Sequence, residues 1–441
     1  EVLDEATRPL VVEGTFDEIF AGQQPILMGV EPNSFCWITG DVAANREGTT
    51  WASHFDLFPS LEHVVTDAGS GLLKGLRLSS ATREDVGLPG IGHSLDVFHT
   101  KREGHRAWRV TESRVWKAQK KAEDLWRPLK KRQQQGLSIQ RQTQRANAAS
   151  REAAQLLDEA IEIETAWREV CSALEWFTPE GDRNTSTAAR AKLNEWLPKL
   201  CGREWEKTVR LLSRPESLTF LDRVEERLSK LNLAADDLET ALRVEWIRRH
   251  PGVLSGESPS SGARRAWWIA TSVRLARDAS LSSAVEQVLA TYRQSWRASS
   301  LVEGINSVVR MQQARHRRLT PGLVDLKRVY WNCREFRTGR RKGHTPYELL
   351  GVRLPTTDWW QLLNTDPKEL RKQLSGQQLR PGKVPVSTTS PTSLSEKVHE
   401  HFLLTSYQQQ PGANPVLHPG ELGAGQLFGV EGVVFRDVRR T

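Results

Sequence analysis

The chain has 441 residues, 38% of them hydrophobic and 26% charged, and this apolar content excludes a wholly disordered protein. No run of 18 apolar residues occurs, which excludes a transmembrane helix, and four scattered cysteines without a Cys-x-x-Cys pair exclude a disulfide scaffold or a cysteine-built zinc site. The net charge is +8, and the cysteine usage favours a reducing cytosol.

The first hundred residues predict a sheet. Three short runs, 9–17, 24–30 and 35–40, are rich in strand-forming residues and are separated by turn residues, so they predict antiparallel strands. Helices are expected at 49–57 and 72–78, and further strands at 63–66 and 94–99. This order predicts an α/β layer in residues 1–104, with the first and fourth strands as neighbours.

From residue 105 the pattern becomes helical. Charged stretches rich in Ala and Leu predict an all-helical insertion over 105–297, in which 133–150 forms a polar connector or a frayed helix. A further helix over 300–317 and a basic segment would complete a second part of the core at 298–352. The extension at 353–441 is expected to be largely disordered, because it turns rich in Gly, Pro, Ser, Thr and Gln from Gly376 onward.

Charge is unevenly distributed along the chain. Residues 1–100 contain 5 Lys and Arg against 15 Asp and Glu, whereas 101–150 contain 14 against 4 and 301–350 contain 11 against 4. An acidic block beside two basic blocks predicts a polyanionic partner and a carboxylate site that holds cations. The alternative for each basic block is a solvated helix face.

Three acidic residues stand out by their expected positions. Asp17 is expected at or near the end of the first strand, Asp67 ends the fourth, and Glu303 lies in the first turn of the 300–317 helix. Carboxylates brought together there would suit two Mg²⁺ ions about 3.5–4 Å apart, which activate water or a 3′-hydroxyl against a phosphodiester. Each also has a local alternative: a strand end for Asp17, a turn or helix cap for Asp67, and a capping box for Glu303.

Several motifs occur in an order that resembles a known family. They are Phe16-Asp17-Glu18-Ile19-Phe20, Gly29-Val30-Glu31-Pro32, Val65-Thr66-Asp67-Ala68-Gly69, Asp96-Val97-Phe98-His99, Ser300-Leu301-Val302-Glu303-Gly304-Ile305-Asn306, Tyr330-Trp331-Asn332, and Gly343 to Leu350. Over residues 9–352 this set resembles a DDE transposase of a bacterial insertion sequence.

The resemblance implies a fold, a site and a reaction. The fold would be an RNase H-like core interrupted by a helical insertion, with Asp17, Asp67 and Glu303 as the catalytic and metal-binding triad. Two Mg²⁺ ions, which Mn²⁺ can replace, would support cleavage at transposon ends and strand transfer into target DNA. The partners would be DNA and further copies of the chain, as a homodimer or higher oligomer in the bacterial cytosol. Because few residues precede the first strand, the usual N-terminal DNA-binding region is expected to be missing.

Further residues are candidates for contacts with DNA. His99 would orient a phosphate or a catalytic carboxylate, or would only be a structural histidine at a strand end. Asn306 and Arg310 share a helix face with Glu303. The remaining candidates form a basic cluster and a cation–aromatic cluster suited to base stacking; they are Arg315, Arg317 and Arg318, and Arg264, Arg265, Trp267 and Trp268. Most of the tryptophans are expected to be helix-packing core.

Two alternatives to a transposase stay open at this point. An RNase H-like nuclease would nick DNA without joining it. A catalytically inactive DNA-binding protein derived from a transposase would bind without cutting, although the intact acidic residues argue against it.

Overall fold

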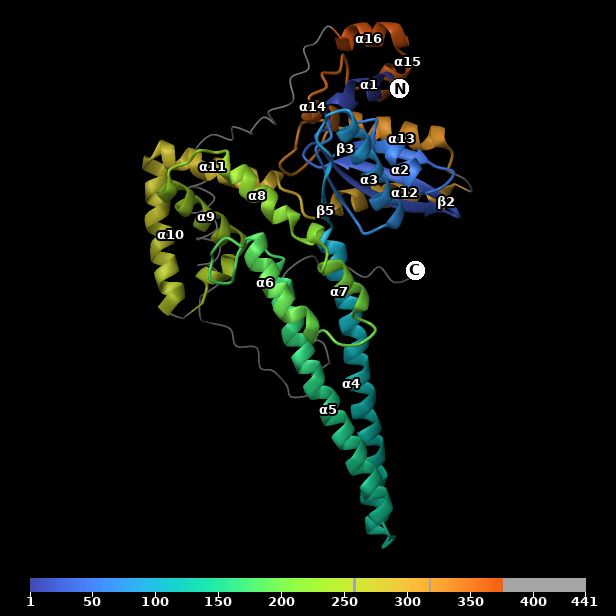
Figure 1. The fold of residues 1–441 in the computed structure, drawn as a ribbon, viewed down its shortest axis with the longest axis vertical. Coiled ribbons are helices and arrows are strands. Elements are labelled where there is room, and N and C mark those ends of the chain that lie inside the picture. Colours follow the sequence, from blue (N-terminus) through green and yellow to red (C-terminus); the bar gives the residue numbers. More distant parts are fainter. Residues whose placement is uncertain (257–258, 317–318, 376–441) are drawn as a thin grey trace, which may run out of the picture. The chain divides into compact units, whose positions relative to one another are not determined.

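The computed structural model describes residues 1–256, 259–316 and 319–375, and shows a mixed α/β protein (Figure 1). Its sheet has five strands in the order β3-β2-β1-β4-β5. The strands are β1 (Glu13–Ala21), β2 (Gln24–Glu31), β3 (Cys36–Val42), β4 (His63–Thr66) and β5 (Gly92–Leu95). β1, β2 and β3 form an antiparallel meander, while β4 is parallel to β1 and β5 is parallel to β4. The predicted antiparallel strands and the neighbouring first and fourth strands are therefore confirmed.

Two predicted strand ends are wrong. β1 does not end at Asp17 but continues to Ala21, because its pairing with β2 extends four residues beyond Asp17. The fifth strand ends at Leu95, and helix α4 (Val97–Gln134) begins directly afterwards. The helix starts there because the side chain of Asp96 accepts the backbone N–H of His99, which caps the first turn. His99 is therefore helical and not part of a strand.

Alternation along the strands creates two apolar faces. On one face Phe16, Leu27 and Val64 pack with residues of α2 (Gly48–Phe55) and α3 (Ser70–Asp85). On the other, Ile19 and Met28 pack with α12 (Ser300–Arg315) and α13 (Pro321–Cys333). The second face is the one that positions the helix bearing Glu303.

Between β5 and α12 the described residues are helical, as the sequence predicts, and contribute no strand to the sheet. After α4 the α-helices of this insertion are α5 (Gln140–Ala173), α6 (Ser186–Trp196), α7 (Glu206–Leu212), α8 (Thr219–Ser229), α9 (Ala235–Arg249), α10 (Pro259–Arg277) and α11 (Ala279–Gln294). Short 3-10 turns lie at Leu197–Lys199, Pro215–Ser217 and Pro251–Leu254.

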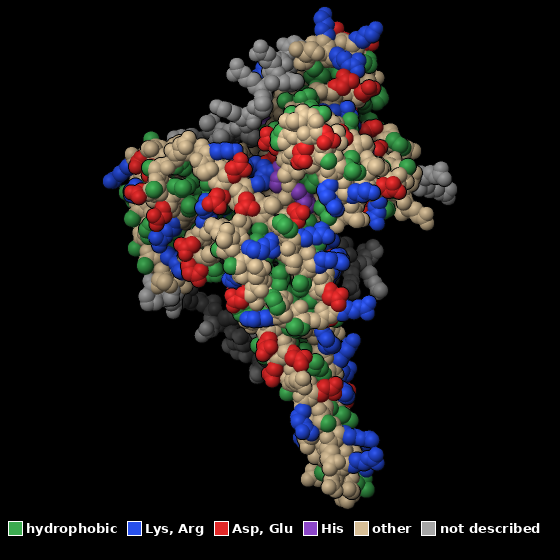
Figure 2. Space-filling model, viewed as in Figure 1, with side chains coloured by type: hydrophobic (Ala, Val, Ile, Leu, Met, Phe, Trp, Pro, Cys, Tyr) green, Lys and Arg blue, Asp and Glu red, His purple; other side chains and the backbone are tan. Residues whose placement is uncertain are grey.

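Helices α4 and α5 form a long antiparallel hairpin. With 38 residues, α4 is roughly 57 Å long at 1.5 Å per residue. Small residues line the distal seam, where Ala118, Ala122, Ala149 and Ala153 pack together. Of the two expectations for 133–150, the helical one holds for most of the segment, because α5 begins at Gln140 and buries alanines from its second turn. Figure 2 shows Lys and Arg mixed with Asp and Glu along this hairpin.

The base of the hairpin is packed more closely. A Cβ on Gly104 would lie 2.0 Å from the ring of Trp167, so the closest approach of the two helices requires glycine there. Trp167 in turn packs against Trp205 in the core of the insertion. The prediction that tryptophans mainly pack helices holds for these residues and for Trp246, but Trp116 and Trp126 are exposed.

The end of the described chain corrects another expectation. Residues 353–375, expected to belong to a largely disordered extension, include α15 (Trp359–Asn364) and α16 (Pro367–Ser375), which follow α14 (Pro346–Leu350). Leu362, Leu370 and Leu374 are buried in the same apolar core as Phe16, Leu27 and Val64. Arg371 forms ion pairs with Glu5 of α1 (Val2–Thr7). A 3-10 turn at Arg8–Leu10 connects α1 to the sheet. The rest of the expected extension, 376–441, lies outside the described residues.

None of the described helices is long and apolar enough to span a membrane.

Candidate active site

The strand register brings two of the candidate carboxylates to one edge of the sheet. In the parallel pair, Phe16 of β1 lies opposite Thr66, the last residue of β4. The next residues along the two chains are Asp17 and Asp67. Asp17 is therefore inside β1 but directly beyond the end of its pairing with β4, which leaves its carboxylate beside the loop that follows β4.

Asp17 is buried, with 8% of its surface exposed. Its Oδ1 accepts the backbone N–H of Glu18 at 2.8 Å, and its Oδ2 accepts the amide of Asn306 at 2.8 Å. The pKa of Asp17 is raised to about 6, mainly by burial and in smaller part by the negative charges of Asp67 and Glu303, while the N–H of Glu18 and the charge of His99 act in the opposite direction. Both other predicted carboxylates therefore act electrostatically on Asp17.

Asp67 begins the turn between β4 and α3. Its Oδ1 accepts the backbone N–H of Gly69 at 2.8 Å, so the predicted turn role is observed. The hydroxyl of Thr66 donates to the carbonyl of Asp67 and lies 3.0 Å from the Nε2 of His93. These contacts fix the loop and leave the other carboxylate oxygen of Asp67 without a hydrogen bond to the described residues.

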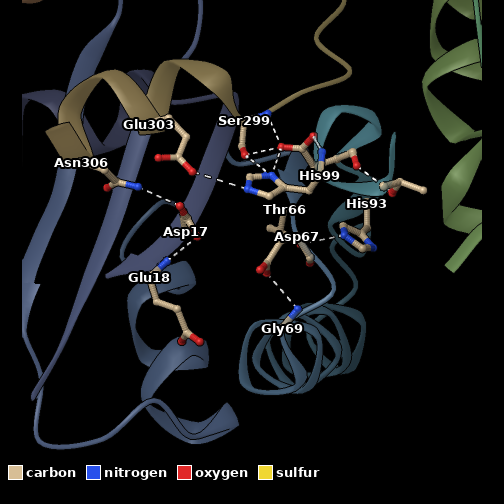
Figure 3. Close-up of polar contacts among 12 residues, drawn as sticks. Asp17, Glu18, Thr66, Asp67, Gly69, His93, His99, Ser299, Glu303 and Asn306 are labelled. Atoms are coloured by element: carbon tan, nitrogen blue, oxygen red, sulfur yellow. Dashed lines mark hydrogen bonds and ion pairs between the residues drawn. The ribbon is translucent and has the colours of Figure 1, made fainter. Parts of the chain in front are cut away.

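Glu303 lies in the first turn of α12, as predicted. Its Oε1 is 3.5 Å from the Nε2 of His99, and its Oε2 is 3.2 Å from the Nη1 of Arg310. The capping box, the local alternative for Glu303, is absent, because the N-cap is Ser299 and its side chain does not bond to the helix. In Figure 3 the side chains of Glu303 and Asp17 point toward one another, and Asp67 lies at the end of the neighbouring strand.

His99 links Glu303 to a buried carboxylate. Its Nδ1 lies 2.8 Å from the Oδ2 of Asp96, which also accepts the backbone N–H of Ser299 at 2.7 Å and the hydroxyl of Ser299. Although burial alone would lower it, the hydrogen bond and charge of Asp96 raise the pKa of His99. Asp96 thus joins the first turn of α4 to the start of α12, holds the ring of His99 beside Glu303 and favours its protonated form (Figure 3).

The donor chemistry of this site suits a hard divalent cation. Carboxylate oxygens are the ligands that Mg²⁺ prefers, and Mg²⁺ is usually held by only one or two carboxylates together with water and substrate phosphates. Among residues 1–256, 259–316 and 319–375, no three His, Cys, Asp or Glu side chains are spaced to hold a single ion. A metal ion at this site would therefore be held by two of the three carboxylates of Asp17, Asp67 and Glu303.

The position of Asn306 does not support the expected DNA contact. Asn306 is fully buried, and its amide donates to Asp17, so it orients a carboxylate and cannot reach an external ligand. Arg310 is half exposed and paired with Glu303, while Arg315 is exposed at the end of α12. Arg317 and Arg318 lie outside the described residues.

The cation–aromatic cluster on α10 makes its contacts with other residues of the insertion. Arg264 lies over the ring of Trp246, and Arg265 donates to the carbonyls of Leu254 and Gly256. Trp267 and Trp268 are partly buried against the core of the insertion. The structure therefore does not bring these residues into the carboxylate site.

Sequence reasoning missed Ser299 and His93. Ser299 gives two hydrogen bonds to Asp96, 203 residues away, and His93 contacts Thr66. The sequence offered one relevant signal: an aspartate three residues before His99, at the start of a long charged helix, is typical of an N-cap.

No model of a known protein family matches this chain, and no curated protein matches its sequence significantly. The function must therefore be inferred from the chain's own residues.

Proposed function

We propose that this protein is a metal-dependent DNA strand-transfer enzyme of the DDE transposase type, with an RNase H-like core. The observation that supports it best is the placement of carboxylates from separate elements around Asp17: the β1–β4 register puts Asp17 and Asp67 directly beyond the paired residues, and both Asp67 and Glu303 raise the pKa of Asp17. Among the described residues, neither Asp17 nor Asp67 forms an ion pair with an arginine or lysine, which is costly for folding but suits a site whose ligand is cationic.

The residues have distinct roles in this proposal. Asp17, Asp67 and Glu303 would hold Mg²⁺, which supplies an activated water or 3′-hydroxyl and stabilises the leaving oxygen. Asn306 and the N–H of Glu18 orient the carboxylate of Asp17. His99, held by Asp96, positions Glu303 and places positive charge beside the reacting phosphate. The DNA partner is supported by the basic blocks at 101–150 and 301–350.

The test is nicking and joining of DNA by single variants. Asp17→Asn, Asp67→Asn and Glu303→Gln should each abolish Mg²⁺-dependent nicking of supercoiled DNA while binding of the same DNA persists, because each removes one anionic ligand. Asp85→Asn, which removes an exposed carboxylate at the end of α3, is the matched control and should nick normally. Near-wild-type nicking by a triad variant would remove that residue from the site.

Joining separates this proposal from a nuclease. A labelled oligonucleotide with a free 3′-hydroxyl should become covalently attached to plasmid DNA, and attachment should require the same three carboxylates. Nicking without attachment would favour an RNase H-like nuclease. DNA binding with neither activity would favour a protein that has lost catalysis.

A further inference from the structure

A second feature of the chain is a pocket of about 290 Å³ rich in arginine and aromatic residues. It lies where the insertion returns to the core, between the end of α11, the residues 295–299 and the start of α12. Its lining includes Arg249, Arg293, Arg297, Arg340, Tyr292 and Trp296. The carboxylate site does not include any of these side chains.

Two of the four guanidinium groups in this pocket have a carboxylate partner, which each shares with a second cation. Arg249 pairs with Glu245 at 2.6 Å, and Arg297 pairs with Glu175 at 2.8 Å. Arg293 and Arg340, in contrast, have no carboxylate partner in the part of the chain that the structure describes. Arg340 only lies over the ring of Trp296, 5.4 Å from its centroid.

These two arginines are also close to one another. Partial burial, together with the charge of Arg293, lowers the pKa of Arg340. Two like charges in one pocket repel each other, and an anion between them would remove that repulsion. The planar guanidinium fork is suited to phosphate oxygens, which it can bind with two parallel hydrogen bonds.

Two further features accompany these arginines. Tyr292 lines the pocket and is 2% exposed, and its buried hydroxyl has no hydrogen-bond partner among the described residues. Ser300, also in the lining, begins the 16-residue helix α12, whose N-terminus no side chain caps. The start of a helix adds partial positive charge and free N–H groups to an anion site.

We propose that this pocket binds the phosphate group of a nucleotide-sized ligand, with Arg293 and Arg340 as its main contacts. The pocket volume suits one nucleotide and is far too small for a duplex. Its position also connects the pocket to the carboxylate site through the helix itself, because Ser300 and Glu303 lie within one turn of α12. A bound phosphate would therefore stabilise the N-terminus of the helix that carries Glu303.

The phosphate could belong to a DNA strand or to a free nucleotide, and a binding experiment separates these sources. Titration calorimetry with ADP, without metal, is performed on the full chain, on Arg293→Gln/Arg340→Gln, and on Arg277→Gln/Arg337→Gln. The last variant removes two exposed arginines, Arg277 at the end of α10 and Arg337 in the segment between α13 and α14 that also carries Arg340. It therefore matches the change in net charge. ADP should bind the pocket variant at least tenfold more weakly than the full chain, and the control should stay within twofold.

Competition then identifies the source. If a single-stranded tetranucleotide displaces ADP from the full chain, the natural ligand is a DNA strand, and this arm rests on the proposed function. If ADP binds but the tetranucleotide does not displace it, the ligand is a free nucleotide. Equal ADP affinity in the pocket and control variants, or no binding to the full chain at millimolar ADP, would overturn the proposal. Neither result depends on cleavage, so the phosphate site and the catalytic proposal can fail separately.

Discussion

Two carboxylates on strand β1 are buried to the same extent but surrounded differently. Glu13 and Asp17 are four residues apart on one face of the strand, with 7% and 8% of their surfaces exposed. Glu13 forms ion pairs with Arg223 and Arg227 of α8, whereas Asp17 accepts only neutral donors and faces two further carboxylates. The first arrangement stabilises the contact between sheet and insertion. The second leaves the carboxylate of Asp17 without a direct ion pair, and only the nearby ring of His99 offsets its charge, which is the property expected of a cation-binding site.

The largest effect should come from removing the compensated carboxylate. Glu13→Ala leaves the partly buried Arg223 and Arg227 without an anion, and breaking such a pair from one side costs about 3–5 kcal/mol. Urea unfolding should therefore show a loss of about 3 kcal/mol or more. A loss below 1 kcal/mol would mean that water solvates the two arginines in the variant. Glu13 and Asp17 would then not differ in how their charges are compensated.

Removing the uncompensated carboxylate should have the opposite sign. The pKa of Asp17 is raised from 3.8 to about 6, so folding favours its protonated form, and stability falls as pH rises through this interval. Above pH 6 the penalty approaches about 3 kcal/mol at 1.36 kcal/mol per pKa unit. Asp17→Asn should thus stabilise the metal-free protein at pH 7.5 and give no gain below pH 4. Unfolding in EDTA at the two pH values measures this, and a destabilised variant at pH 7.5 would contradict it.

A smaller effect should follow from changing the neutral donor. Asn306→Ala removes the amide that stabilises the charged form of Asp17, and hydrogen bonds to charged groups contribute about 1.5–3 kcal/mol. The pKa of Asp17 should rise by about 1–2 units. The acid limb of the pH profile for nicking should therefore move upward, with activity recovering at higher pH. Ser307→Ala, on the exposed side of the same helix, is the control and should leave the profile unchanged.

These contrasts also show what the sequence could and could not reveal. Strand and helix patterns predicted the elements that carry Asp17, Asp67 and Glu303, because alternation and turn residues are local signals. The partners are not local. Glu13 is paired with residues 210 and 214 positions away, and Asn306 donates to a carboxylate 289 positions away. Nothing in the neighbourhood of Glu13 or Asn306 distinguishes a structural contact from a functional one, so only the folded chain separates the two carboxylates of β1.

The smallest effect concerns cations, for which the same contrast applies. Arg315 is exposed, and no described residue neutralises it, whereas Arg168 on α5 is equally accessible but pairs with Glu164 at 2.9 Å. If uncompensated charge marks the binding surface, Arg315→Ala should reduce the salt dependence of DNA binding and Arg168→Ala should not. Loss of one phosphate contact lowers the slope of log K against log salt by about 0.9 on duplex DNA. Fluorescence anisotropy between 50 and 200 mM salt, roughly the range over which such contacts are screened, resolves that change. Equal slopes for the two variants would mean that Arg315 is only a solvated charge, and the DNA surface would have to be sought along the α4–α5 hairpin instead.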